Sequence, residues 1–321
     1  MKILLGRDDV NPNKLNMNGE TPLMYASSIG DEGVVKLLLG RDDVNPGKPD
    51  KDGRTPLWWA AHNRHEGAIK ILLGRDGVNP NTPDVGGRTP LWWAAYHGHE
   101  GMVGMLLGRD GIDPDKPDGS GQTPLSSATE SRHEGVVRML LRRYDINPNK
   151  PDKESQTSLW WAAYHGYEGM VKILLGHADI NPDNSNMYGQ TPLGCAAEGG
   201  HEGVVRTLLG RDEVNPNKPD KDGKTPLWWA ACYGHEGIVK ALLGRDDVDP
   251  DKPDKCGQTP LACAAGNGHK GVVKMLLGRD DVDPNKPDKY GRTPLRLATL
   301  NSYEGVIDLL RPPASAPHST A

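Results

Sequence analysis

The sequence predicts an all-α fold in which helix–turn–helix repeats stack into a solenoid with protruding hairpin loops. A Thr-Pro-Leu motif, or a close variant, begins again every 34 residues, at Thr21, Thr55, Thr89, Thr123, Thr157, Thr191, Thr225, Thr259 and Thr293. Nine copies in register, without insertion or deletion, indicate a repeat array. Composition agrees, because 36% hydrophobic residues and no Phe are few for one globular core but enough for thin cores between stacked units.

The first helix of each unit is predicted from the Thr-Pro-Leu motif onward, and the second copy illustrates it. Thr55 is expected to be the N-cap that accepts a bond from free backbone N–H groups, and Pro56 suits the first helical position. Leu57, Ala60 and Ala61 are spaced i, i+3 and i+4, so they form one apolar stripe on a short helix. The two alanines leave room for a second helix to approach closely.

A turn and a second helix follow in each unit. Arg64 occupies the turn position at which several other copies carry glycine, and it is expected to end the first helix. The second helix is predicted from Glu66 to Leu73, with Ile69 and the leucines facing inward. Glu66 in its first turn complements the helix dipole, and Gly74 ends the helix.

The stretch from Arg75 to Gly87 carries Asn-Pro-Asn and Gly-Gly, which are typical of turns. Each predicted helix has about eight residues, fewer than the ~12–15 that an isolated helix needs, so each unit must bury its stripe against its neighbours. We expect a partial repeat in residues 1–15, one array of nine repeats in residues 16–310, and a disordered tail in residues 311–321.

Four short motifs recur together in each unit: Thr-Pro-Leu-x-x-Ala-Ala, Gly-His, Val-Val-x-x-Leu-Leu and Asp-Val-Asn. In this order they resemble the ankyrin repeat, from Leu4 to about Leu310. The Gly-Arg-Asp-Asp-Val-Asn-Pro and His-Glu-Gly-Val-Val segments also resemble the ankyrin arrays of fungal multidomain proteins, including NACHT-type receptors. The resemblance implies a module that binds another protein along a concave groove and at its hairpin tips.

The units depart from the family pattern in three ways. They have 34 residues where the family has about 33, because Asn-Pro-Asn-Lys-Pro-Asp lengthens the hairpin arm. The fifth copy carries Ser155, Ser158 and Tyr167 in place of Gly, Pro and His, and we predict a weaker joint there. The family's histidine after Thr-Pro-Leu, with its hydrogen bonds, is missing in every copy, and its place is taken by Met24, Trp58, Trp92, Ser126, Trp160, Gly194, Trp228, Ala262 and Arg296.

Composition argues against several classes of partner and compartment. The net charge is −5 and both signs are interspersed, so nucleic acid is not an expected partner. The apolar run after Met1 stops at Gly6, too short for a signal peptide, and no apolar run approaches the ~18 residues of a membrane span. Four cysteines are not a disulfide framework, so we expect an intracellular protein, cytoplasmic or nuclear, in a reducing compartment.

No residue pattern indicates catalysis, a cofactor or a metal. Cys195 and Cys263 occupy equivalent positions two units apart, too far for a bridge, so the cysteines are expected to be inert. The Asp-Pro-Asp-Lys-Pro-Asp loops lack the spacing of a calcium loop, and no nucleotide-binding or hydrolase motif occurs. One histidine per repeat does not converge as zinc ligands must, so a structural role in the turn is expected for His65, His99, His133, His201, His235 and His269.

Tryptophan pairs lie on four of the predicted first helices: Trp58 and Trp59, Trp92 and Trp93, Trp160 and Trp161, and Trp228 and Trp229. They either fill the core between repeats or form an aromatic stripe that a partner contacts. The core interpretation is favoured for the second Trp of each pair, and both interpretations stay open for the first. Trp58 and Trp92 are therefore candidate partner-contacting residues.

The positions directly after Ala-Ala vary most between copies, as expected of binding positions within a constant unit. By the resemblance they face the groove, where the candidates are His62, Asn63, Tyr96, His97, Tyr164, His165 and Tyr233. The three tyrosines are the expected anchors, because Tyr makes large contacts at low entropic cost. The hairpin tips add Lys51, Arg54, Arg88, Lys153, Lys221, Lys224 and Arg292. Alternatively, all of these residues are exposed but unconstrained.

Two functions follow from these expectations. The first is a monomeric, non-catalytic scaffold that binds a protein partner along its groove and hairpin tips. The second is a structural spacer, or C-terminal arm of a larger protein, without a tight partner of its own.

Overall fold

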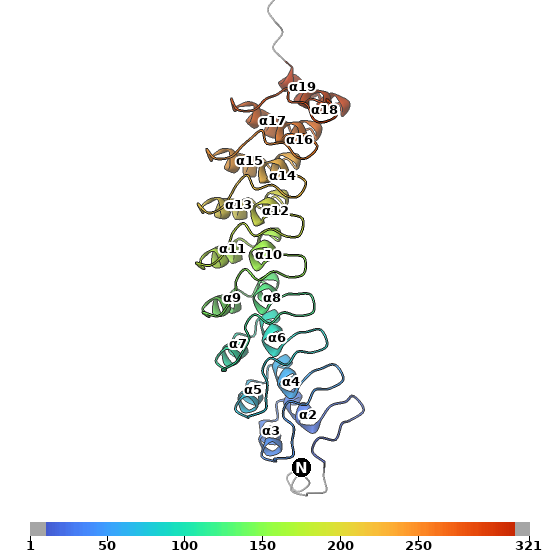
Figure 1. The fold of residues 1–321 in the computed structure, drawn as a ribbon, viewed down its shortest axis with the longest axis vertical. Helices are drawn as coiled ribbons and strands as arrows, with labels where there is room; N and C mark the ends of the chain where they lie inside the picture. The colour runs from blue at the N-terminus through green and yellow to red at the C-terminus, as the bar shows by residue number, and fades with distance from the viewer. Residues whose placement is uncertain (1–10, 312–321) are drawn as a thin grey trace, which may run out of the picture. The chain divides into compact units, whose positions relative to one another are not determined.

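The computed structural model describes residues 11–311, so residues 3–5 of the predicted partial repeat and residues 312–321 of the predicted tail lie outside it. The described residues form eighteen α-helices in pairs, with a hairpin loop after each pair (Figure 1). This confirms the predicted all-α helix–turn–helix architecture. The nine repeats are numbered in chain order. Among the described helices, none is long and apolar enough to cross a membrane.

The chain divides into two compact units, and each is described by itself. Unit 1 contains residues 11–161 and 173–180 of the described chain. Its first helices pack against one another in a row, and its second helices pack in an adjacent row (Figure 1). The first helices are α2 (Pro22–Ile29), α4 (Pro56–His62), α6 (Pro90–Tyr96) and α8 (Pro124–Glu130). The second helices are α3 (Glu32–Leu39), α5 (Glu66–Leu73), α7 (Glu100–Leu107) and α9 (Glu134–Leu141).

Unit 2 contains residues 162–172 and 181–311 of the described chain and has the same two rows. The helices α10 (Ser158–Tyr164) and α11 (Glu168–Leu175) of repeat five contribute residues to both units. The first helices of unit 2 are α12 (Pro192–Glu198), α14 (Pro226–Cys232), α16 (Pro260–Gly266) and α18 (Pro294–Leu300). The second helices are α13 (Glu202–Leu209), α15 (Glu236–Leu243), α17 (Lys270–Leu277) and α19 (Glu304–Leu310).

The Thr-Pro motif starts the first helices as predicted. The Thr55 hydroxyl accepts a hydrogen bond of 3.2 Å from the N–H of Trp58, and Pro56 occupies the first helical turn. Thr89 and Thr225 cap α6 and α14 in the same way. Such a cap satisfies an N–H that the helix cannot, which contributes about 1 kcal/mol per helix.

The thin core between the helix pairs is made by the predicted apolar stripes. Leu57, Ala60 and Ala61 are at most 1% exposed, and Ile69 and Leu72 are completely buried. Burying one such large aliphatic side chain contributes roughly 1.5–3 kcal/mol. The core therefore comes from a few residues in each repeat, and every repeat depends on its neighbour to cover them.

The turn between the paired helices requires a left-handed backbone conformation. Gly98 adopts a φ of +70° there and Gly234 a φ of +73°, whereas Arg64 adopts a φ of +62° at the same position in repeat two. This confirms that Arg64 ends α4, although a residue with a Cβ pays a conformational penalty that glycine avoids.

Side-chain amides join neighbouring hairpin arms. In unit 1 the amide nitrogen of Asn81 donates to the carbonyl of Gly111 at 2.7 Å, and its oxygen accepts from the N–H of Asp113 at 2.9 Å. In unit 2 the side chain of Asn217 makes the same pair of bonds to the next arm, at 2.5 and 2.8 Å. Each bridge satisfies two backbone groups that no helix or sheet could satisfy.

Aspartate replaces this asparagine in alternate arms. Asp115 in unit 1 and Asp183 in unit 2 each accept one backbone N–H through Oδ2, from Asn147 at 2.6 Å and Asn215 at 3.1 Å. Their Oδ1 atoms are buried and have no hydrogen-bond partner. Burial, the largest influence on both, raises the pKa of Asp115 and of Asp183 above the ordinary value.

Candidate functional site

In four repeats an aspartate fixes the hairpin arm to the first helix that follows it. In repeat two the Asp50 side chain is fully buried and its Oδ1 accepts the N–H groups of Asp52 and Arg54, each at 2.9 Å. Its Oδ2 accepts Arg54 Nε at 2.9 Å and the indole N–H of Trp59 at 3.2 Å. The Arg54 guanidinium also lies 4.5 Å from the centre of the Trp59 ring. We call this arrangement the aspartate clamp, because one carboxylate positions both a tip residue and an aromatic residue.

The clamp recurs in both units with small changes. In repeat three Trp93 donates to Asp84 at 3.0 Å, and Arg88 lies 4.5 Å from the ring centre of Trp93. In repeat seven Trp229 donates to Asp220 at 3.1 Å, with Lys224 Nζ 4.5 Å from the ring. The second Trp of these pairs is therefore half-buried at the site surface, held by a carboxylate on its edge and a cation on its face.

The second Trp of each pair, for which the sequence analysis favoured the core, is only half-buried, and the first Trp, for which both interpretations stayed open, is buried. Trp58 and Trp92, proposed as partner-contacting residues, are only 5% exposed, whereas Trp59 and Trp93 are half-buried. The reason is their position on the helix. Trp58 lies on the buried side with Leu57, whereas the indole N–H of Trp59 donates to Asp50 in the preceding hairpin.

Two of the first Trp residues, Trp92 and Trp228, make a hydrogen bond from the position of the missing histidine, whereas the indole N–H of Trp58 is buried without a partner. In unit 1 the indole N–H of Trp92 donates to the carbonyl of Gln122 at 3.1 Å, and in unit 2 Trp228 donates to that of Gln258 at 3.1 Å. Each acceptor lies in the hairpin of the next repeat. The larger indole therefore fills the core between repeats and links a first helix to the hairpin arm of the next repeat.

The candidate site of unit 1 is a cavity of about 380 Å³ between the hairpins of repeats two and three. Trp59, Trp93 and His62 contribute aromatic faces to it, and Arg54 and Arg88 contribute their clamped side chains. The rings of His62 and Trp93 are 5.6 Å apart, edge to face. The arrangement is rigid and aromatic, and it suits contact with a protein surface rather than acid–base chemistry.

Next to this cavity the predicted residues Tyr96 and His97 lie on the same surface. Tyr96 is stacked on Trp92 with ring centres 5.3 Å apart, and His97 is stacked on Trp93 at 5.4 Å. His97 is also stacked on His99 at 5.5 Å. Stacking on buried or clamped rings holds these side chains in place.

The recurring histidines join each repeat to the preceding one. His65 Nε2 hydrogen-bonds the carbonyl of Ser28 at 3.0 Å, and His269 bonds that of Cys232 at 2.9 Å. The bond therefore reaches the last turn of the preceding first helix. Equivalent bonds are made by His133, His201 and His235. Within residues 11–311 no cluster of three or more His, Cys, Asp or Glu side chains is arranged to hold a metal ion.

His99 is the exception, and Arg64 explains it. Arg64 stands at the turn position of repeat two, and its Nε donates to His99 Nε2 at 2.5 Å in place of a carbonyl contact. His99 Nδ1 is buried without a partner. Burial, and then the positive charge of Arg64, lower the pKa of His99 to about 4. Burial likewise lowers the pKa values of His62 and His97, so this cluster resists protonation.

The candidate site of unit 2 is a cavity of about 490 Å³. Tyr164, Tyr233 and His165 line it together with the acidic side chain of Glu198 and the small residue Gly199. Tyr233 is 52% exposed and is stacked on the clamped Trp229 at 6.0 Å. This surface therefore combines exposed tyrosines with a carboxylate, and it lacks the paired arginines of the unit 1 cavity.

The remaining predicted residues divide by exposure. Those exposed to solvent are Lys51, His62, Asn63, Tyr96, Lys153, Tyr164, His165, Lys221 and Tyr233. Those half-buried are Arg54, Arg88, His97, Lys224 and Arg292, and the cationic groups among them pair with acids of their own hairpins. The half-buried cations are therefore neutralised within their own hairpins, whereas the tip residues Lys51, Lys153 and Lys221 are exposed.

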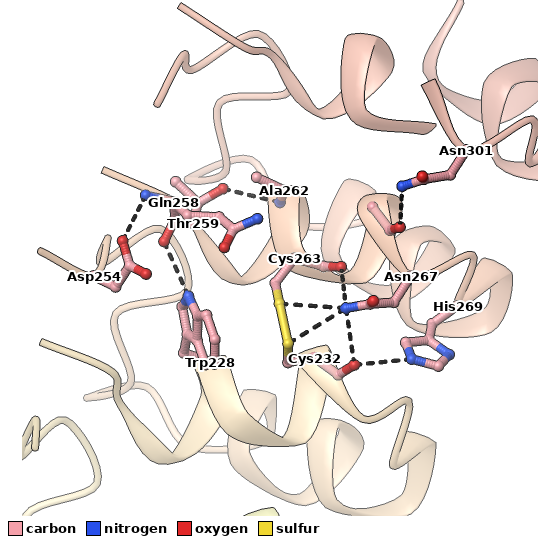
Figure 2. Close-up of a disulfide and its surroundings, with 11 residues drawn as sticks. Trp228, Cys232, Asp254, Gln258, Thr259, Ala262, Cys263, Asn267, His269 and Asn301 are labelled. Atoms are coloured by element: carbon pink, nitrogen blue, oxygen red, sulfur yellow. Dashed lines mark hydrogen bonds between the residues drawn. A yellow bond between two sulfur atoms is a disulfide. The ribbon is translucent and has the colours of Figure 1, made fainter. Parts of the chain in front are cut away.

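The expectation that all cysteines are inert was wrong for two of them. Cys232 at the end of α14 and Cys263 on α16 form a disulfide with Cα atoms 5.0 Å apart (Figure 2). Comparing residues in the same phase of the repeat overlooked this pair, which lies 31 residues apart and so faces across two adjacent repeats. Cys195 is buried and Cys256 is exposed, and neither forms a disulfide.

The sequence analysis also missed the aspartate clamp. The signal was present, because an Asp or Asn recurs five residues before every Thr-Pro-Leu start, as at Asp50 and Asp220. Its meaning was hidden because the same residues are typical of solvated turns. Only the fold places the second Trp within hydrogen-bonding distance of that carboxylate.

Comparison with known proteins gives a family match along the chain. A family model described as ankyrin repeats, in three copies, matches residues 1–84, 45–118, 77–152, 111–186, 159–254 and 237–319. These overlapping segments leave only the last two residues unmatched. No curated protein matches the chain significantly.

Proposed function

This chain belongs to the ankyrin repeat family, and from that premise we propose that it is a non-catalytic scaffold that binds a protein partner. Ankyrin repeats are generally protein–protein interaction modules. The proposed contact surfaces are the unit 1 and unit 2 cavities with the tyrosines beside them, together with the hairpin tips.

The observation that carries the proposal is the exposure of tyrosines on pre-ordered supports. Tyr96 is 41% exposed, Tyr164 50% and Tyr233 52%, and all three occupy the most variable stretch of the repeat. Tyr96 and Tyr233 are stacked on tryptophans that are themselves hydrogen-bonded. Ordering these rings on binding therefore costs little conformational entropy, which is the property of an interface anchor.

Electrostatics supports a protein partner rather than nucleic acid. Arg54 pairs with Asp50 and Asp52, and Arg292 pairs with Asp288. A nucleic-acid surface needs unpaired cations that can displace counterions from phosphates. The repeats are equivalent and evenly spaced, and no single repeat carries a divergent chemical cluster, which also supports a binding role. We further propose that the protein is a monomer in the cytoplasm or nucleus.

Affinity capture from a cell extract tests the proposal. The parent chain is compared with a variant that carries Tyr96→Ala, Tyr164→Ala and Tyr233→Ala, and with the control Tyr144→Ala, whose ring is 95% exposed and lies outside both cavities. Circular dichroism first establishes that the three chains fold alike. We expect a partner that the parent and the control retain and the triple variant loses.

The same experiment separates the scaffold from the spacer alternative. If the parent and the triple variant capture the same proteins, the cavities are not the recognition surfaces. If neither captures a protein, a spacer or C-terminal arm without a tight partner is the better description.

A further inference from the structure

We propose that Cys232 and Cys263 form a reversible redox modification site at the junction of repeats seven and eight in unit 2. Its co-reactants are low-molecular-weight thiols and disulfides of the glutathione class. The bond sets how firmly repeats seven and eight are joined beside Tyr233. Its effect on partner binding rests on the proposed function above, whereas the thiol chemistry does not.

The repeat geometry itself brings the two sulfurs together. A residue at the end of one first helix faces the residue 31 positions later on the next first helix. His62 and Trp93 stand in this relation with ring centres 5.6 Å apart, and Tyr164 and Cys195 line one cavity. At Cys232 and Cys263 the Cα separation of 5.0 Å is within the range that a disulfide spans.

Cysteines occupy both of these positions at only one junction. The pairs at the other junctions, read from the sequence, are Ser28 and Trp59, His62 and Trp93, Tyr96 and Ser127, Glu130 and Trp161, Tyr164 and Cys195, Glu198 and Trp229, and Gly266 and Leu297. The stack therefore tolerates many side chains at these positions. A cysteine pair is not needed to build the junction. Thiol chemistry is therefore what distinguishes this junction from the others.

The two sulfurs differ in access. Cys263 is 3% exposed, whereas Cys232 is half-buried and precedes Tyr233, which lines the unit 2 cavity. An external thiol therefore reaches the sulfur of Cys232 first. Cys195 shows the contrast, because burial raises the pKa of its thiol far above the ordinary value and removes it from exchange.

Asn267 is positioned to assist the exchange. Its amide nitrogen lies 3.4 Å from Cys232 Sγ and 3.6 Å from Cys263 Sγ, and also donates to the carbonyls of both cysteines at 3.2 and 3.1 Å (Figure 2). An N–H donor near a sulfur favours the thiolate over the thiol. Asn267 is therefore a positioning residue that supports a thiolate at either cysteine.

The exchange is balanced by glutathione. In the oxidising direction the Cys232 thiolate attacks one sulfur of glutathione disulfide, which forms a mixed disulfide and releases one glutathione thiolate. The Cys263 thiolate then attacks the Cys232 sulfur and releases the second glutathione thiolate. The two cysteines lose two electrons in total, the glutathione disulfide gains them, and the two cysteine protons pass to the released thiolates. Two glutathione molecules reverse both steps.

Opening the bond loosens the junction between repeats seven and eight. The disulfide links α14 to α16, and the carbonyl of Cys232 also accepts hydrogen bonds from His269 and Asn267. A cross-link of this kind restricts the unfolded chain as well as the folded one. Reduction is therefore expected to increase local opening around residues 230–237 and to lower the thermal midpoint by about 5 °C.

The test uses the full chain in glutathione buffers of graded ratio, quenched with N-ethylmaleimide and read by peptide mass spectrometry. We expect Cys232 and Cys263 to gain or lose alkylation together, with one midpoint and no stable glutathione adduct. Hydrogen exchange in residues 230–237 is expected to follow the same midpoint, while exchange in residues 56–62 stays constant. None of these measurements needs a partner. They can therefore contradict the redox proposal without contradicting the proposed function, and a failed capture experiment leaves the redox proposal intact.

Three results would overturn the proposal. The first is two thiols that stay reduced in glutathione disulfide, and the second is a bond that stays closed in millimolar reduced glutathione. The third is a stable glutathione adduct at Cys232 with Cys263 unreacted. The matched control is Cys256→Ser, which removes the exposed hairpin thiol and is expected to leave the midpoint unchanged.

The role of Asn267 has its own readout. In the reduced chain, Asn267→Ala is expected to move the pH profile of Cys232 alkylation upward by roughly half a pH unit, because one N–H donor to the thiolate is lost. A purely structural role would change the thermal midpoint without moving that profile, and this outcome would remove Asn267 from the exchange mechanism.

Discussion

Repeats two and three in unit 1 and repeats seven and eight in unit 2 place different chemistry on the same backbone positions. The facing pair between first helices is His62 and Trp93 in unit 1, and the disulfide-bonded Cys232 and Cys263 in unit 2. The turn residue is Arg64 in the first case and a glycine in the second. The Thr caps are the same in both, and an aspartate clamp is present in repeats two, three and seven. The frame is therefore constant, and the character of each surface is set by two or three positions per repeat.

The clamps of the two regions also differ in strength. Asp50 binds both Trp59 and the guanidinium of Arg54. Asp220 binds Trp229, whereas Lys224 pairs with the exposed Asp222 at 3.5 Å. A charge-assisted hydrogen bond to a buried carboxylate is stronger than an exposed ion pair, so the hairpin of repeat two is expected to be held more firmly than that of repeat seven.

The largest expected effect comes from removing a clamp. Asp50→Ala leaves Arg54 and two backbone N–H groups without their buried acceptor, which costs about 3 kcal/mol. Asp220→Ala removes no buried ion pair and is expected to cost about 1 kcal/mol less. Urea unfolding combined with hydrogen exchange in α4 and α14 measures both.

The control for this comparison is Asp52→Ala, because the Asp52 side chain is 56% exposed and pairs with the same Arg54. It is expected to change stability by less than about 0.5 kcal/mol. Equal losses for Asp50→Ala and Asp52→Ala would mean that the clamp is no stronger than a surface ion pair.

The next largest effect is expected when the turn residues of the two regions are exchanged. A Cβ at Gly234 would lie 2.5 Å from Nδ1 of His269, and the position has a positive φ, so Gly234→Arg is expected to cost roughly 2 kcal/mol. Arg64→Gly removes the same conformational penalty from unit 1 and is expected to stabilise it by about 0.5–1 kcal/mol. It also frees His99 to bond the carbonyl of His62, as the other histidines bond theirs.

NMR titration of His99 in the Arg64→Gly chain makes the test specific. The pKa of about 4 is expected to rise toward the ordinary histidine value, because the charge of Arg64 is gone and a carbonyl accepts the ring N–H. If the pKa of His99 stays near 4, burial alone sets it and Arg64 is not what distinguishes this repeat.

Much of the fold could be predicted because its causes are local. Thr55 and Pro56 start a helix through their own backbone chemistry, and the spacing of Leu57 and Ala60 defines its buried face. The variable positions after Ala-Ala were equally visible, and Tyr96 and Tyr233 are exposed as expected. The weaker joint at repeat five and the partner contacts themselves stay predictions.

The parts that could not be predicted depend on contacts between elements. Trp58 and Trp59 are adjacent and identical, and it is Trp59 that bonds Asp50 in the hairpin before its helix. Cys232 and Cys263 lie 31 residues apart rather than 34, so a search in the phase of the repeat does not pair them. The first contact joins a hairpin to its own helix and the second joins neighbouring repeats, and local propensity encodes neither.

A smaller effect is expected on the hairpin arms, where the two units can be compared directly. Asp115→Asn in unit 1 and Asp183→Asn in unit 2 supply the amide donor that Asn81 and Asn217 already use, and each is expected to stabilise its unit by about 1 kcal/mol. The converse variant Asn81→Asp is expected to destabilise unit 1 by a similar amount. Urea unfolding at pH 7 measures all three.

The stability gained by Asp115→Asn is expected to depend on pH in one direction. Because the folded-state pKa of Asp115 is raised, protonation restores a donor, so this group stabilises the parent chain below its unfolded pKa and that stability is lost as pH rises through the folded pKa. The advantage of Asp115→Asn is therefore expected to shrink as pH falls through that range. An advantage that does not change with pH would show that the carboxylate does not titrate in this way.

The smallest effect is the opposite pH dependence of the histidine cluster in unit 1. The folded-state pKa of His99 is about 4, and those of His62 and His97 are also lowered, so the unfolded chain binds more protons below pH 6.5. The stability that depends on neutral rings is present above that pH and is lost as pH falls toward 4. Hydrogen exchange, corrected for its intrinsic pH dependence, is expected to show α4 and α6 opening more readily at pH 5 than at pH 7, with α14 and α16 changing less. Equal changes in both regions would mean that the histidine rings are solvated and that the aromatic surface of repeats two and three does not prevent their protonation.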